Sequence, residues 1–243
     1  MCTLTYLPFA GGFFFTSNRD EISSRAAAVF PEYEEAAGKR LLMPLDPQGG
    51  GTWILAAENG EAACLLNGAF VNHQRQPPYR KSRGRVIVES FGYASIRTFI
   101  EQYNFDQIEP FTLVKTTQPF GQREIHEIRW DGSNIHHNTL NPEQPHIWSS
   151  VTLYDEKMRS KRNQWFDGWL DSSPDFTSEN IRHFHLHGGE GDPTVDFRMT
   201  RSGGLQTISL TSIKVYKEAA EVDYFNLRTD TREKAMLALR DDA

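Results

Sequence analysis

The sequence contains little cysteine, and this limits what its thiols can do. Only Cys2 and Cys64 are present among 243 residues, which excludes a framework of disulfide bonds. Cys64 lies in the apolar run AACLLN, so we expect a small buried residue there. Cys2 directly follows the start methionine, where chain ends are usually frayed and expendable. A thiol at that position therefore calls for an explanation.

Long apolar runs and an excess of positive charge are also absent. No apolar run is long enough to cross a bilayer, and the first residues lack the pattern of a secretory signal. We therefore expect a cytoplasmic protein without a membrane span. The formal net charge of −6 argues against a nucleic-acid partner. No repeat or linker is visible, so residues 1–243 are predicted to form a single domain.

Strand patterns dominate what is present. Apolar and polar residues alternate in pairs of segments separated by turn residues, which predicts antiparallel hairpins. The predicted pairs are 3–7 with 13–17, 52–57 with 62–67, 123–130 with 134–140, and 194–201 with 205–216, and 222–227 adds a further strand. Helical spacing occurs at 93–104 and 155–170, and residues 231–243 form a short helix or fray. This predicts an α+β protein with two face-to-face antiparallel sheets covered by helices, although a simple β-sandwich with added helices fits the same periodicity.

The first predicted hairpin explains the position of Cys2. With a turn around Phe9 and Ala10, opposed residue numbers sum to about 19 or 20. Cys2 then lies opposite residue 17 or 18, and Arg19 and Asp20 follow the second strand. A thiol, an α-amine, a guanidinium group and a carboxylate would share one small volume.

These four groups suit a nucleophile. If Met1 is removed, Cys2 carries a free α-amine with an ordinary pKa of about 7.7–8.0, which can accept the thiol proton. Arg19 would stabilise the thiolate and could hold a substrate carboxylate, and Asp20 could orient the amine. The alternative is that Arg19 and Asp20 form a simple ion pair that closes the hairpin.

Two segments carry a resemblance to a known family. MCTLTYLP with TSNRDE, and then GGGTWILAAENGEAACLLN, resemble the NRDE family, also called the transport and Golgi organisation type 2 family. The resemblance covers residues 2–67. The triple glycine before Thr52 resembles a phosphate loop only superficially and is expected to allow a close approach or a sharp turn.

The same N-terminal layout resembles the N-terminal-nucleophile hydrolases, in particular the choloylglycine hydrolase and penicillin V acylase branch. This resemblance implies a four-layer αββα sandwich and catalytic roles for Cys2, Arg19, Asp20 and Asn67. It gives Asn67 the task of donating to the oxyanion of a tetrahedral intermediate. A second asparagine of that branch matches Asn141, or with less support Asn138, and a late arginine of the branch corresponds to Arg198 or Arg201.

Histidines form a second notable pattern. His183, His185 and His187 recur at period two, which on a strand would place them on one face as metal or haem ligands or as part of a polar sheet surface. A polar surface is the preferred interpretation, so no metal is predicted. In a strand, His136 and His137 would point to opposite faces and could not act together.

Two classes of function remain open on the sequence. One is an enzyme that hydrolyses a non-peptide C–N amide bond through a Cys2 thioester, without a cofactor, on a small-molecule amide. The other is a non-catalytic binding or carrier protein that holds an apolar ligand, a lipid-like molecule or haem, in the same cleft; the family's association with haem and lipid handling implies this second possibility.

Overall fold

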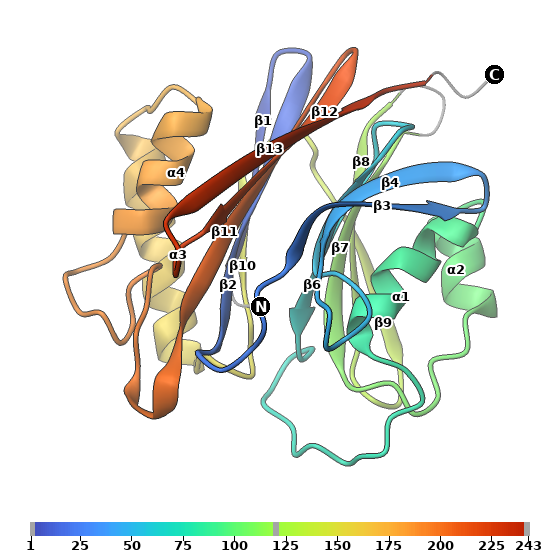
Figure 1. Cartoon of the computed structure of the whole chain (residues 1–243), viewed down its shortest axis with the longest axis horizontal. Helices are drawn as coiled ribbons and strands as arrows, with labels where there is room; N and C mark the ends of the chain where they lie inside the picture. Colours follow the sequence, from blue (N-terminus) through green and yellow to red (C-terminus); the bar gives the residue numbers. More distant parts are fainter. Residues whose placement is uncertain (1–2, 119–121, 241–243) are drawn as a thin grey trace.

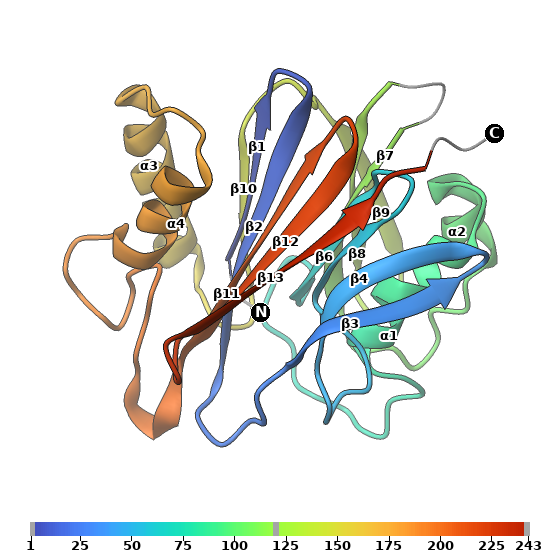
Figure 2. The same cartoon turned by 45° about the horizontal axis from the view of Figure 1, so that its top comes forward.

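The structure is a computed structural model that describes residues 3–118 and 122–240. Two antiparallel sheets face each other, and helices cover the outer face of each sheet (Figure 1). The order of layers is helices, sheet, sheet, helices, which is the predicted αββα sandwich. Figure 2 shows the same four layers from a second direction.

Sheet A contains six strands, and every neighbouring pair is antiparallel. In spatial order these are β10 (His146–Ser149), β1 (Thr3–Phe9), β2 (Gly12–Ile22), β11 (Leu205–Tyr216), β12 (Ala219–Asn226) and β13 (Thr231–Ala238). Strand β2 thus lies between the first and the eleventh strands of the chain, and Tyr216 pairs with Gly12.

Sheet B contains seven strands in the order of the sequence. They are β3 (Val29–Ala36), β4 (Lys39–Leu45), β5 (Ile54–Ala57), β6 (Ala62–Asn67), β7 (Phe111–Thr117), β8 (Glu124–Trp130) and β9 (Ile135–Leu140). Because each strand pairs with the next along the chain, short turns suffice to build most of this sheet.

Alternation along the strands forms the core between the sheets. Leu4 and Tyr6 of β1 and Phe13 and Phe15 of β2 are fully buried there, together with Cys64 of β6. The intervening residues point to the helix layers, as a period of two requires.

Two pairs of helices cover the sheets. Helices α1 (Arg83–Glu89) and α2 (Ile96–Gln102) pack on sheet B, and α3 (Glu156–Asp171) and α4 (Ser178–His187) pack on sheet A. Asp155 and Thr177 cap α3 and α4 by accepting hydrogen bonds from the backbone amides of Met158 and Asn180, as expected at helix N-termini.

The first hairpin forms, but its register differs from the prediction. Opposed residue numbers sum to 21, with Thr3 opposite Asn18 and Phe9 opposite Gly12. The turn residues are Ala10 and Gly11, and Gly11 has a φ of 84°, which glycine adopts readily. The predicted turn one residue earlier was wrong because it ignored this requirement.

Two predictions about the C-terminal third were also wrong. Residues 194–201 do not form a strand, because Asp192 accepts hydrogen bonds from the backbone and the hydroxyl of Thr194 and holds a turn there. Residues 231–238 form β13 rather than a helix, and pair with β12 over eight positions. Strands β3, β4 and β7 and helix α1 were not predicted.

Candidate active site

A cleft of about 590 Å³ opens at one end of the sandwich. We call it the sheet-end cleft. Its walls come from β2, Arg25, residues 46–53, the end of β6, residues 72–84, Glu109 and residues 152–153. Five cationic side chains and three carboxylates line it, so its walls are predominantly polar and carry a positive excess.

Arg19 is the most buried cation of the cleft. It is only 3% exposed, its Nη2 donates to Asp46 Oδ2 at 3.0 Å, and its guanidinium carbon lies 4.2 Å from the centre of the Trp53 ring. Its Nη1 is buried without a hydrogen-bond partner among the described residues. Burial lowers the pKa of Arg19, because the low-polarity surroundings disfavour the charge. Arg19 therefore offers an unused donor at the cleft.

Asp46 holds this part of the cleft together. Its Oδ2 also accepts from Arg25 at 2.6 Å, and its Oδ1 accepts from the backbone amides of Gln48 and Gly49 at 3.0 and 3.2 Å. Burial alone would raise the pKa of Asp46, but Arg25 and Arg19 outweigh it and the pKa is lowered. Two guanidinium groups thus share one carboxylate, which leaves a local positive excess.

Asp20 lies on the other face of sheet A. Consecutive residues of a strand point to opposite faces, and Asp20 accepts hydrogen bonds from Tyr154 at 2.6 Å and from Thr207 at 2.5 Å. Arg19 pairs with Asp46 rather than with Asp20, so the simple ion pair considered from the sequence does not form.

Arg162 supports this second face. It is fully buried on α3, donates to Thr3 Oγ1 at the start of β1, and stacks 3.8 Å above the Tyr154 ring. Its Nη2 also donates to the carbonyls of Val195 and Asp196. The first described residue is therefore fixed from the helix side.

Asn67 ends β6 and lines the cleft, as expected. Its backbone carbonyl accepts from Ser150 Oγ at 2.9 Å, which ties the end of β6 to the residue after β10. Its side-chain amide forms no hydrogen bond with another described residue, and its N–H groups remain available.

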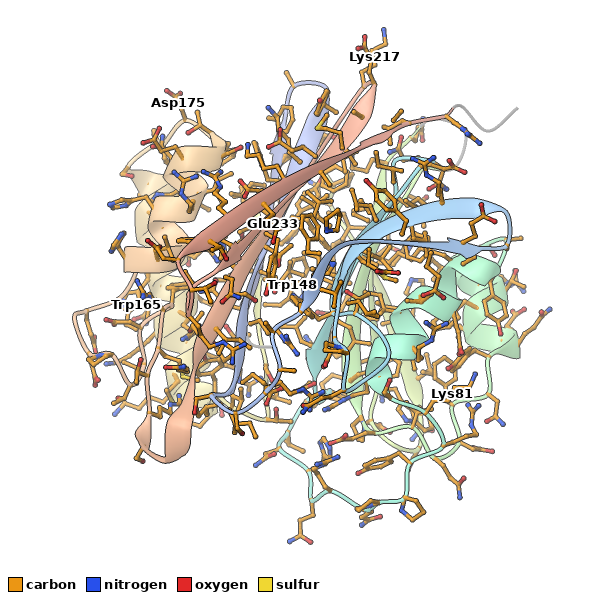
Figure 3. All side chains as sticks on the ribbon, in the orientation of Figure 1. Lys81, Trp148, Trp165, Asp175, Lys217 and Glu233 are labelled. Atoms are coloured by element: carbon orange, nitrogen blue, oxygen red, sulfur yellow. The ribbon has the colours of Figure 1, made fainter. Side chains whose placement is uncertain are left out.

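A second charged group borders the cleft. Glu109 is 7% exposed and contacts His73 at 3.2 Å and both Arg75 and Arg83 at 3.3 Å. Lys81, labelled in Figure 3, lies on the same segment. Burial lowers the pKa of Arg83. This group adds to the positive excess of the cleft.

Comparison with known proteins gives the family. The family model described as Transport and Golgi organisation 2 matches residues 2–184. The chain belongs to the Transport and Golgi organisation 2 family. No curated protein matches its sequence.

Solved structures similar to this Transport and Golgi organisation 2 family member are N-terminal-nucleophile hydrolases. The Caenorhabditis elegans ortholog of N-acylethanolamine-hydrolyzing acid amidase is 10% identical, with a TM-score of 0.58 over 87% of this chain and 92% of that chain. Penicillin V acylase from Agrobacterium tumefaciens is 10% identical, with a TM-score of 0.52 over 96% and 85%. A variant of conjugated bile acid hydrolase from Clostridium perfringens is 11% identical, with a TM-score of 0.52 over 96% and 92%. At these identities the similarity establishes the N-terminal-nucleophile hydrolase fold.

Other residues predicted for the site lie elsewhere in this family member. Asn141 is exposed in the turn between β9 and β10, where its Oδ1 accepts from the amide of Glu143. Asn138 is an exposed residue of β9 near Glu127. Neither asparagine lines the sheet-end cleft, because β9 and β10 bring this turn towards Tyr6, well along β1 from Thr3.

The two late arginines also lie outside the cleft walls. Arg198 is exposed. Arg201 donates to the backbone carbonyls of Leu153 and Thr194 at 2.9 and 2.8 Å, so it supports one wall from behind. The buried arginine beneath β1 is instead Arg162, which helical spacing alone did not single out.

The prediction that His183, His185 and His187 share one face of a strand was wrong. They lie on α4, and His185 is fully buried between Thr5 Oγ1 and Asn18 Oδ1. Burial lowers its pKa to about 3. Among the described residues no group of three or more potential ligands is placed to hold a metal.

Only one of the two cysteines, Cys64, lies among the described residues. Cys2 and the predicted removal of Met1 lie outside the described residues. Cys64 is fully buried, and burial raises the pKa of its thiol to about 12, which makes it inert as a nucleophile. No helix among the described residues is long and apolar enough to span a membrane.

Proposed function

We propose that the chain is an N-terminal-cysteine amidohydrolase that cleaves a non-peptide amide carrying an anionic group. One observation carries this proposal: Arg19 from sheet A and Asn67 from sheet B line one cleft beside the start of β1. The hydrolase fold of the similar structures supports the reaction type.

The start of β1 lies between residues that reach this cleft. Thr3 is paired with Asn18 on one side and with Ser149 on the other. The next residues along those partner segments are Arg19 and Ser150, and the Ser150 hydroxyl donates a hydrogen bond to the Asn67 carbonyl. Cys2 is one peptide bond from Thr3, so its Cα is about 3.8 Å from that of Thr3. This supports Cys2 as the nucleophile of the cleft.

In the first half-reaction the α-amine of Cys2 takes the proton of the thiol. The thiolate then attacks the amide carbon, and the carbonyl electrons form an oxyanion that the Asn67 amide stabilises. Collapse of this intermediate breaks the C–N bond, and the ammonium returns its proton to the leaving amine. The products of this step are a Cys2 thioester and a free amine.

In the second half-reaction the α-amine takes a proton from water, which attacks the thioester. A carboxylic acid leaves, and the thiol recovers its proton. Asp20, fixed by Tyr154 and Thr207, orients the amine through both steps. The reaction requires no cofactor, and we retain the predicted cytoplasmic location.

The charge of the cleft supports an anionic substrate. The buried and unpartnered Nη1 of Arg19 costs free energy unless an acceptor meets it, and a guanidinium group matches a carboxylate well. Haem fits these walls poorly, because it needs a wide apolar slot while five cationic side chains line the cleft. An apolar cargo is disfavoured for the same reason.

The test combines an intact-mass measurement with an assay of amide hydrolysis. Protein expressed without an N-terminal tag should lack Met1 in an intact-mass measurement. The protein is then given a panel of N-acyl amides that share one acyl chain and carry either a carboxylate or a neutral group on the amine. We expect a thioester on Cys2 and release of the amine, with faster turnover of the acidic amides. Cys2→Ala should abolish both signals.

Cys64→Ala is the matched control, because it removes the only other thiol and should leave labelling unchanged. Retention of Met1 on essentially all molecules overturns the hydrolase proposal. Labelling without turnover favours a carrier that uses the same cleft.

A further inference from the structure

A second and smaller cavity lies beside the outer edge of sheet A. It has a volume of about 140 Å³, and we call it the β10 groove because Ile147, Trp148 and Ser149 of that strand form one wall. Trp148, labelled in Figure 3, belongs to the core between the sheets. The remaining walls come from β6, β7, β8 and α3.

The groove is positively charged. Arg129 of β8 and Arg159 of α3 line it, and no carboxylate does so among its described lining residues. Two residues of the groove wall donate hydrogen bonds to the Glu127 carboxylate, Arg129 at 2.7 Å and the Trp148 indole at 2.8 Å. Arg159 forms no ion pair with a described carboxylate. Two cations and one paired anion leave one uncompensated positive charge.

The groove also holds unused hydrogen-bond donors. Arg129 Nε, Arg159 Nε and Ser149 Oγ are each buried without a partner among the described residues. Arg129 is held in place by the backbone carbonyl of Ala69 and by the Phe70 ring, 5.1 Å from its guanidinium carbon. Its free Nε is therefore the result of a fixed orientation and not of a loose side chain.

We propose that the β10 groove binds a small oxyanion, such as phosphate, sulfate or a carboxylate, through Arg129, Arg159 and Ser149. A buried donor without an acceptor is unfavourable, so such atoms normally find a partner. Water could accept from the three donors, since the volume equals that of about four or five waters. Water would leave the charge of Arg159 uncompensated, whereas an oxyanion satisfies both the donors and the charge.

An oxyanion bound in the β10 groove would connect three layers of the fold. The ligand would contact α3, the edge of sheet A and β8 of sheet B at once. Ser149 and Leu66 line the groove. The residues that follow them, Ser150 and Asn67, are joined by a hydrogen bond. The groove therefore backs onto the sheet-end cleft without sharing a lining residue with it. This inference does not depend on the proposed amidohydrolase activity.

The experiment titrates the full-length protein with inorganic phosphate, sulfate and acetate against chloride at constant ionic strength. Calorimetry should give a dissociation constant of about 1 mM or lower for at least one oxyanion, and the thermal midpoint should rise with its concentration. Arg159→Gln should weaken binding about ten-fold or more, because one charge-assisted contact is lost. Ser149→Ala is the milder second variant and should weaken binding while the protein remains folded.

Two control variants locate the site. Arg97→Gln removes one positive charge from an exposed position and should leave binding unchanged. Arg75→Gln removes a cation of the sheet-end cleft and should also leave it unchanged. The proposal is overturned if no oxyanion binds in preference to chloride, as a groove filled only by water predicts. It is equally overturned if Arg159→Gln and Ser149→Ala both bind as tightly as the unaltered protein, or if Arg75→Gln abolishes binding.

Discussion

Arg19 and Asp20 are joined by one peptide bond, yet they work on opposite faces of sheet A. Arg19 reaches Asp46 and Trp53 in the cleft, while Asp20 is held by Tyr154 and Thr207 on the helix side. The alternation of a strand produces this division. It places a cation towards the sheet-end cleft and an anion behind the start of β1.

Arg19→Gln should separate anionic from neutral amides. The variant loses the guanidinium donor that faces the cleft, while Asp46 keeps Arg25 as its partner and the fold is preserved. Loss of one charge-assisted hydrogen bond is worth about 1.5–3 kcal/mol, so we expect KM for an acidic amide to rise at least ten-fold. Steady-state kinetics on a matched pair of acidic and neutral amides measures this. An equal loss on both substrates would show that Arg19 does not select the charge.

Residue patterns predicted only part of the site. Arg19 could be placed from its distance to the first hairpin turn, whereas Asn67 was assigned through the family resemblance. Asp46 and Glu109 could not be placed, because their partners are distant in the sequence. Asp46 is 27 residues from Arg19, and Glu109 is 36 residues from His73. Such partners meet only in the folded chain, and local spacing in the sequence gives no sign of their contact.

Among the elements, the segment before β5 depends on a close approach of two backbones. A Cβ on Gly51 would lie 2.3 Å from the backbone carbon and oxygen of Gly84, and the amide of Thr52 donates to the Gly84 carbonyl at 3.1 Å. The triple glycine thus brings residues 49–52 against the start of α1. The close approach expected from the sequence is confirmed.

Gly51→Ala should destabilise the protein by about 1–3 kcal/mol, because the methyl group meets backbone that must move. Gly92→Ala is the matched control, since nothing lies within 4 Å of its Cβ and its φ is not positive. Urea denaturation compares the two. The explanation fails if both variants have the same midpoint as the unaltered protein.

The identity of an element was hardest to predict where two periodicities compete. RHFHLH alternates as a strand does, but Ile181, Phe184 and His185 also fit one face of a helix, and the Thr177 cap starts that helix upstream. Strand β13 shows the reverse case, because all its residues except Thr231 are good helix formers and only pairing with β12 makes them a strand.

At the scale of the whole molecule, a buried histidine makes stability depend on pH. His185 is fully buried and has a pKa of about 3, below its ordinary value of 6.5 because of burial. The pKa of His126, which is also buried, is lowered as well, mainly by burial. At His185 the unfolded chain binds a proton below about pH 6.5, whereas the folded chain does so only near pH 3, so acid favours unfolding.

We therefore expect the free energy of unfolding to fall as the pH is lowered from 6.5 to 4.5. One fully linked proton contributes a slope of about 1.4 kcal/mol per pH unit, and carboxylates add little above pH 4.5. His185→Gln should reduce this slope relative to the unaltered protein. Urea titrations at several pH values measure it, and identical slopes in both proteins would contradict the assignment to His185.

The layered architecture was the most predictable property of the molecule. Hairpins at 52–67 and 123–140, and the helix at 155–170, all formed within a few residues of their predicted bounds. The order of strands in sheet A was not predictable, because β10 and β11 join β1 and β2 from far along the chain. Local turn signals carry no information about such neighbours.

That topology has a consequence in time. Strand β2 is completed by β11, whose residues 205–216 follow those of β2 by about 190 positions. At a synthesis rate of about 5–20 residues per second, β2 waits about 10–40 s on the ribosome for that neighbour. Throughout that interval β2 is the open edge of an unfinished sheet, and only the last third of the protein covers that edge.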